Sequence, residues 1–132
     1  MSRAERRSFE IQEHKEAIYN RDDGFCRSCG EKVPWPGECA HIVPKSRANA
    51  LRYGPMMIET LISCGIRINP LKSVESYGLE ALNLSDNLAL THHGECNDAQ
   101  LIGASLIEAD VHMQHVLEVF EMEHTTHAAV QV

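Results

Sequence analysis

Two short turns with paired potential metal ligands constrain the fold of this chain more than any other feature. The first is Cys26-Arg27-Ser28-Cys29, followed by Gly30, and the second is His93-Gly94-Glu95-Cys96. In both turns two residues separate the potential ligands, and a glycine lets the backbone curl. Structural Zn²⁺ takes four ligands of this kind in a tetrahedron. The spacing therefore predicts a structural zinc site formed by Cys26, Cys29, His93 and Cys96.

The other histidine and cysteines leave alternatives open. His92 competes with His93 for the third ligand position, because it lies next to it and has the same side chain. The pair Cys26 and Cys29 would otherwise be buried thiols or a redox pair, but no βαβ pattern surrounds them. Two further cysteines are expected to be small buried hydrophobes, and these are Cys39 and Cys64. Five cysteines are an odd number, which favours metal ligation in a reducing compartment over a disulfide framework.

The length and composition are those of an ordinary soluble globular protein. At 132 residues the chain is predicted to be one domain, and its 43% hydrophobic and 23% charged residues allow a packed core. The longest apolar runs are far too short to span a membrane, and the N-terminal segment lacks the apolar core of a signal peptide. We therefore expect a cytoplasmic protein with no membrane partner.

Charge is distributed unevenly along the chain, whose net charge is -7. Residues 1–72 hold all 12 basic side chains and 9 of the acidic ones, a balance of +3, whereas residues 73–132 hold the other 10 acidic side chains. A phosphate backbone would be attracted to the first part and repelled by the second. The acidic part is also explained by a solvated helix face, and both interpretations can hold together.

Apolar periodicity predicts several short elements. A helix is expected over residues 3–20, with Gly24 as its stop, and a short strand over residues 38–43. A second helix is expected over residues 55–64, with Pro55 in its first turn. A third is expected over residues 71–82, broken near Gly78.

The strongest helical pattern runs from residue 98 to about residue 123. Its apolar positions recur at intervals of three and four residues, as in the a/d seam of a coiled coil, and they are Ile102, Leu106, Ala109, Met113, Val116 and Phe120. The seam predicts either packing onto the other helices of the chain or a homodimer through this C-terminal helix. Residues 124–132 are expected to be a frayed tail.

Two further segments complete a recognisable pattern. One is Ala40-His41-Ile42-Val43-Pro44, and the other runs from Asn87-Leu88-Ala89-Leu90 to Cys96-Asn97. Together with the CxxC turn, they resemble the HNH endonucleases. The resemblance implies an α+β fold: a ββα-metal finger with structural zinc, elaborated by several helices that include a long C-terminal one. The finger core would cover about residues 21–105, with a helical insertion at residues 48–82, inside a single domain of residues 1–132.

The same resemblance implies roles for three residues. His41 would be the general base that activates water, a task suited to a side chain whose ordinary pKa is about 6.5. Asn87 would pin a loop through side-chain bonds to the backbone, and Asn97 would ligate a catalytic cation, Mg²⁺ or Mn²⁺. Each has a simpler alternative, because a strand histidine can be structural, Asn87 can be a turn residue and Asn97 can cap a helix.

The chain departs from the family at Ala40. Many members have an aspartate or histidine before the general base, where it ligates the catalytic metal, and alanine has no ligand atom. Glu38, His92 and Asp98 are candidates to replace it, as are water and substrate oxygens, which Mg²⁺ accepts.

The resemblance implies a metal-dependent DNA endonuclease, a phosphodiester hydrolase of the kind found in phages and mobile elements. Four basic residues flank the finger as candidates for contacts with DNA phosphates, namely Arg27, Lys32, Lys45 and Arg47. The alternative is a non-catalytic, zinc-stabilised module of HNH fold that binds nucleic acid or protein. Ala40 and the acidic second half favour that alternative.

Overall fold

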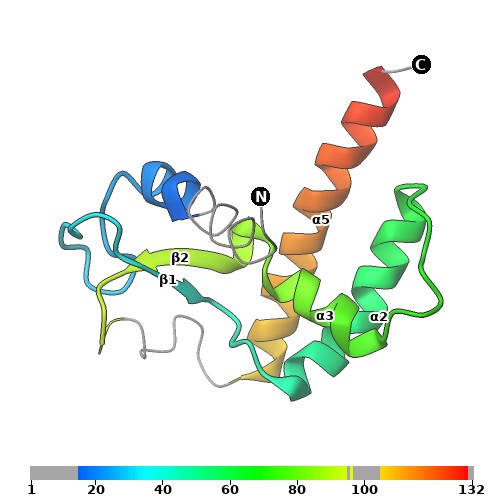
Figure 1. Ribbon diagram of the computed structural model, residues 1–132, viewed down its shortest axis with the longest axis horizontal. Helices are drawn as coiled ribbons and strands as arrows, with labels where there is room; N and C mark the ends of the chain where they lie inside the picture. The colour runs from blue at the N-terminus through cyan, green and yellow to red at the C-terminus, as the bar shows by residue number, and fades with distance from the viewer. Residues whose placement is uncertain (1–14, 95, 97–104, 131–132) are drawn as a thin grey trace, which may run out of the picture. The chain divides into compact units, whose positions relative to one another are not determined.

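The computed structural model describes residues 15–94, 96 and 105–130 (Figure 1). The chain divides into two compact units. The first unit combines Met1–Ile42 with Leu88–Leu101, and the second combines Val43–Asn87 with Ile102–Val132. The predicted insertion of residues 48–82 thus lies in the same unit as the C-terminal helix.

The first unit is built on a two-stranded antiparallel sheet. Strand β1, Glu38–His41, pairs with strand β2, Leu88–Thr91, in a register that sets Glu38 opposite Thr91 and His41 opposite Leu88. Residues 15–21 are helical, and the chain turns back at Gly24, whose φ is +74°. The mixed α+β class is as predicted, whereas the ββα-metal fold itself stays a prediction.

The described residues of the first unit form a small apolar cluster. The buried members of this cluster are Ile18, Cys26, Val33, Leu88 and Leu90. Tyr19, Cys39 and Cys96 pack against them and are partly buried. A cysteine of the predicted zinc site therefore belongs to the hydrophobic core itself.

The second unit is helical. It contains α2, Arg47–Ser63, α3, Val74–Leu82, the short 3₁₀ helix η1, Ser85–Asn87, and the long α5, Leu106–Val130. No helix among the described residues is long and apolar enough to cross a membrane.

Helix α2 begins earlier than the sequence predicts. Ser46 is its N-cap, and the Ser46 hydroxyl accepts a hydrogen bond from the Asn49 amide at 3.1 Å. Pro55 therefore lies inside the helix and not in its first turn. Buried residues before the proline, Ala50 and Tyr53, anchor the additional turns in the core, and this tertiary packing overrides the local effect of proline.

The prediction that Gly78 breaks α3 is wrong. Gly78 lies inside the helix and is buried, because the backbone of α2 passes directly beside it. A Cβ atom at Gly78 would be 1.7 Å from the Ala50 carbonyl oxygen, and one at Gly54 would be 2.3 Å from the Val74 carbonyl oxygen. One glycine on each helix thus permits close packing of α2 against α3.

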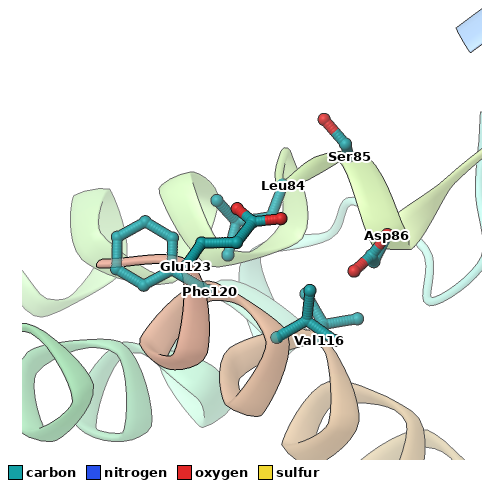
Figure 2. Close-up of a pocket in the computed structure, with 7 residues that line it drawn as sticks. Leu84, Ser85, Asp86, Val116, Phe120 and Glu123 are labelled. Atoms are coloured by element: carbon teal, nitrogen blue, oxygen red, sulfur yellow. The ribbon is translucent and has the colours of Figure 1, made fainter. Parts of the chain in front are cut away.

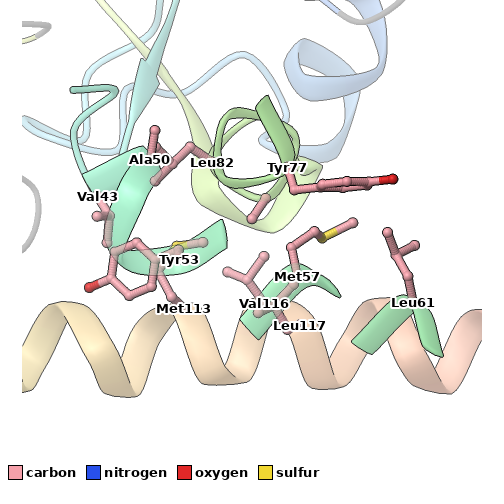
Figure 3. Packing of buried hydrophobic residues seen from close by; sticks show 11 residues of the cluster. Val43, Ala50, Tyr53, Met57, Leu61, Tyr77, Leu82, Met113, Val116 and Leu117 are labelled. Carbon is pink, nitrogen blue, oxygen red and sulfur yellow. The ribbon is translucent and has the colours of Figure 1, made fainter. Parts of the chain in front are cut away.

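Helix α5 contributes its predicted apolar seam to the core of this unit. Met113 and Val116 are buried against residues of α2 and α3 (Figure 3), while Ala109 and Phe120 are partly buried. Leu106 is 58% exposed, and Ile102 lies outside the described residues. The central seam is therefore used within the chain, and a homodimer through this helix stays a prediction.

Candidate metal centre

The CxxC segment forms a tight hairpin. Phe25 and Lys32 are bridged across it, the Cys26 amide donates to the Glu31 carbonyl at 2.8 Å, and the Gly30 amide donates to the Cys26 carbonyl at 2.9 Å. Gly30 has a φ of +78°, a conformation that residues with a side chain rarely adopt. These contacts place Cys26 and Cys29 at one end of the hairpin, which we call the knuckle (residues 25–32).

Four side chains converge at the knuckle. One ligand atom from each lies within 4.8 Å of the others, and the four residues are Cys26, Cys29, His92 and Cys96. This group could hold a metal ion such as zinc, and it includes all three cysteines of the predicted site. Cys39 and Cys64 are not part of it, and both are only half-buried.

The predicted ligand His93 is replaced by its neighbour His92. His93 points elsewhere: its side chain is 89% exposed, and its Nδ1 atom lies 2.9 Å from the Glu38 carboxylate. His92 directly follows β2, and the chain then reverses at Gly94, whose φ is +85°, before it reaches Cys96. The histidine and the cysteine of this turn are thus separated by three residues and not two.

Hydrogen bonding assigns the two ring nitrogens of His92. Its Nε2 atom lies 2.9 Å from the Lys32 carbonyl oxygen, so it carries the proton and donates. In the neutral imidazole the Nδ1 atom then has no proton, and it lies 3.4 Å from Cys29 Sγ. Two ligands of one tetrahedral zinc ion, a sulfur and a nitrogen, would be about 3.5 Å apart. A backbone carbonyl that orients a metal-bound imidazole is a common second partner.

The electrostatics of the thiols also suit a cation. Burial would raise the pKa of Cys26, but amide hydrogen bonds from Cys29, His92 and Ser28 outweigh it and hold this pKa at about 6. Burial, together with the nearby Cys29 and Cys26, raises the pKa of Cys96 to about 11. The protein alone thus stabilises the Cys26 thiolate, and a divalent cation would allow Cys96 to ionise as well. The donor set therefore fits structural zinc.

His41 lies at the other end of the strand pair. It is the last residue of β1, opposite Leu88, and it is half-buried. Thr91, which precedes His92, pairs with Glu38 at the far end. Three residues of extended strand span about 10 Å, so the Cys/His cluster is not placed to activate a water molecule at His41.

Asn87 is wholly buried and bonded to the backbone. Its Oδ1 atom accepts from the Val43 amide at 2.9 Å, and its Nδ2 atom donates to the carbonyls of Val43, at 3.1 Å, and Leu82, at 2.8 Å. The effect of these bonds is to hold the residues just after β1 in the second unit.

Two of the suggested substitutes for a ligand at position 40, Glu38 and His92, lie away from His41, and the third lies outside the described residues. Ala40 is 4% exposed and faces away from solvent. Glu38 is at the opposite end of β1 from His41, and His92 belongs to the Cys/His cluster. Asp98 and Asn97 lie outside the described residues. Within the described part of the chain, the Cys/His cluster is the one group of three or more such ligands.

The four basic candidates for phosphate contacts divide between the units. Arg27 and Lys32 are exposed on the knuckle, whereas Lys45 and Arg47 are exposed in the second unit. The Arg47 guanidinium lies 3.7 Å from the Glu75 carboxylate, which partly neutralises it.

A shallow pocket in the second unit lies between η1 and α5 (Figure 2). Its lining consists of Leu84, Ser85, Asp86, Val116, Val119, Phe120 and Glu123. The charged groups among these residues are two carboxylates, which would repel a phosphate. The pocket is therefore unsuited to nucleic acid.

Similarity to characterised proteins does not assign a family. Comparisons with protein-family profiles, curated proteins and solved structures found no match. The HNH resemblance rests on the residues quoted above, and what the geometry supports is a Cys₃His metal centre at one end of a two-stranded sheet.

Proposed function

We propose that this protein is a metal-dependent DNA endonuclease of the HNH type, with His41 as its general base. The observation that carries the proposal is the arrangement of the first unit, in which one strand pair has a Cys₃His cluster at one end and His41 at the other. The metal cluster would make a small sheet rigid enough to position a catalytic side chain.

In this mechanism the His41 imidazole removes a proton from the water that attacks the phosphorus atom. The phosphorus forms a bond to the water oxygen, and its bond to the 3′ oxygen breaks. Asn97 would hold a Mg²⁺ or Mn²⁺ ion, which would provide Lewis-acid stabilisation of the charge that develops on the departing 3′ oxygen. Arg27 and Lys32 on the knuckle would hold neighbouring phosphates, and Lys45 is a candidate for a separate phosphate contact from the second unit.

A second candidate is a zinc-stabilised module that binds nucleic acid or protein without cutting. Its specific support is the buried position of Ala40, which has no ligand atom where many HNH enzymes have one. In this alternative the Cys₃His cluster has the same structural role, and His41 has no chemistry.

Cleavage of plasmid DNA with Mg²⁺ or Mn²⁺ tests the proposal. His41→Ala should lower the rate on the order of 10²–10⁴-fold, the contribution of a general base. His115→Ala, at an exposed position of α5, is the matched control and should cut normally. Equal rates for both variants would exclude His41 as the base. Salt-dependent DNA binding by a wild-type protein that does not cut would favour the second candidate.

A further inference from the structure

Trp35 is an exposed aromatic residue close to the metal centre in sequence. It is the single tryptophan of the chain, and 48% of its surface is exposed. It lies in the loop Val33-Pro34-Trp35-Pro36-Gly37 that leads into β1 (Figure 1). A large exposed aromatic side chain needs an explanation when its backbone is held firmly, because it is then presented to solvent in a defined position.

The backbone on the N-terminal side of Trp35 is anchored in the core. Val33 is 2% exposed, and its amide donates to the Gly24 carbonyl at 2.7 Å. The Tyr19 hydroxyl donates to the Val33 carbonyl at 2.8 Å. The preceding residue, Lys32, accepts the hydrogen bond of His92 through its carbonyl. The metal centre and this loop are therefore connected through consecutive residues.

The backbone on the C-terminal side is equally confined. Gly37 has a φ of +66°, and a Cβ atom there would lie 2.6 Å from Leu90 and 2.7 Å from Val33. The Trp35 ring itself contacts Tyr19 edge to face, with ring centroids 5.0 Å apart and an interplanar angle of 84°. This contact orients the indole and still leaves nearly half of its surface open.

The knuckle beside this loop supplies cations and a second aromatic side chain. Arg27 and Lys32 are exposed there, opposed by one acidic residue, Glu31. Phe25, bridged to Lys32, is 51% exposed. Exposed aromatic rings next to basic side chains are the arrangement by which proteins bind single-stranded nucleic acids, because bases stack on the rings and phosphates contact the cations.

We propose that Trp35 stacks on an unpaired nucleobase while Arg27 and Lys32 contact the adjacent phosphates. In an intact duplex each base is already stacked on its neighbours, so the site would favour single-stranded or locally unpaired DNA. The inference rests on the proposed function in that the bound strand would be the nuclease substrate. It thereby names the substrate class.

Because Trp35 is the single tryptophan, its fluorescence reports directly on stacking at this site. We would titrate the His41→Ala protein, loaded with zinc, with a thymidine oligonucleotide and separately with a blunt duplex of the same length, and follow tryptophan fluorescence. The oligonucleotide should quench the emission, and the duplex should quench it much less. In a binding assay with a labelled oligonucleotide, Trp35→Ala should raise Kd about 5- to 150-fold.

Two variants separate stacking from folding. Trp35→Phe keeps an aromatic ring and should bind nearly as well as the parent, and Met122→Ala, at a 68% exposed position of α5, is the control for loss of an exposed apolar side chain. Zinc content should be the same in all of them. Unchanged affinity in Trp35→Ala, or equal quenching by both DNA forms, would overturn the inference.

The same experiments distinguish the two proposals. Cleavage by the wild-type protein without quenching by the oligonucleotide would leave the nuclease proposal standing and refute the stacking site. Quenching by the oligonucleotide without cleavage by the wild-type protein would support the stacking site and refute the nuclease proposal.

Discussion

The two units of this protein are stabilised in different ways. Among the described residues, the apolar cluster of the second unit has eleven buried members, supplied by three helices and the segment around Val43. The cluster described in the first unit has five, one of which is the metal-cluster residue Cys26, and the strands of this unit are four residues long. A metal ion adds stability where an apolar cluster is small. We therefore expect the metal to contribute more to the first unit than to the second.

Long-range polar contacts occur in both units, and only in the first does one of them belong to the metal cluster. In the second unit, Asn87 bonds to buried backbone, and Asp110 accepts hydrogen bonds from Arg52 and Tyr53. These bonds connect parts of a unit that already has an extensive core. In the first unit, the bond from His92 to Lys32 connects two segments 60 residues apart and belongs to the metal cluster itself. Loss of the metal should therefore affect the first unit far more than the second.

The largest expected effect comes from removal of the metal site. His92→Ala should lose zinc, because it removes one of four ligands, whereas His93→Ala should retain it. Binding free energies of structural zinc are on the order of 10 kcal/mol, so the first unit should lose amide-exchange protection while α2 and α5 keep theirs. Metal analysis measures the zinc content of each variant, and hydrogen exchange measures the amide protection of each unit. Zinc loss in His93→Ala and not in His92→Ala would reverse the ligand assignment.

The next effect concerns the helix contact in the second unit. Gly78→Ala should destabilise this unit by about 3 kcal/mol, because the new Cβ atom overlaps the Ala50 carbonyl and α3 must move. Gly54→Ala should cost less, since its closest contact is 2.3 Å and not 1.7 Å. Denaturant unfolding monitored by helical circular dichroism gives both values, with zinc content unchanged. A more stable Gly78→Ala protein would contradict the close packing of α2 and α3.

Asn87→Ala should have a somewhat smaller effect. It leaves the Val43 amide and the Leu82 carbonyl buried without their partner, which costs about 1–3 kcal/mol. The same substitution at exposed Asn69, whose side chain makes one local bond to the Leu71 amide, should cost clearly less. The comparison uses unfolding free energies of the two variants. Equal decreases in unfolding free energy for the two variants would mean that the burial of Asn87 adds nothing to its contribution to stability.

The smallest effect is a pH dependence in the second unit. The Arg52 guanidinium and the Tyr53 hydroxyl hold the pKa of Asp110 at about 2, below its ordinary value of 3.8. A carboxyl group with a lowered pKa in the folded state stabilises the protein above pH 3.8, and this contribution disappears as the pH falls toward 2. Asp110→Asn should therefore lower Tm slightly at pH 6 and have a clearly smaller effect at pH 2, where about half of the Asp110 carboxyl is protonated. A difference in Tm at pH 2 as large as that at pH 6 would contradict the assigned cause.

Part of this fold and site can be read from local spacing. The turns at Cys26–Cys29 and near Cys96 follow from glycine and ligand positions within a few residues, and the helix stop at Gly24 follows from a conformation that glycine adopts easily. The a/d spacing of α5 likewise identified Met113 and Val116 as core residues. Each of these depends on contacts or conformations close in sequence.

The sequence by itself determined three of the four clustered ligands, because cysteines separated by two residues beside a glycine are typical of metal-binding turns. Tertiary structure alone decided between His92 and His93, since the deciding partner, the Lys32 carbonyl, is 60 residues away. It also decided that α2 continues through Pro55, because Ala50 and Tyr53 before the proline are buried in the core. It decided that Gly78 lies inside α3, because the backbone of α2 at Ala50 leaves no room for a side chain there. Local sequence patterns predict turns because the conformation of a turn depends on residues close in sequence. The choice between adjacent side chains depends on tertiary contacts with residues distant in sequence.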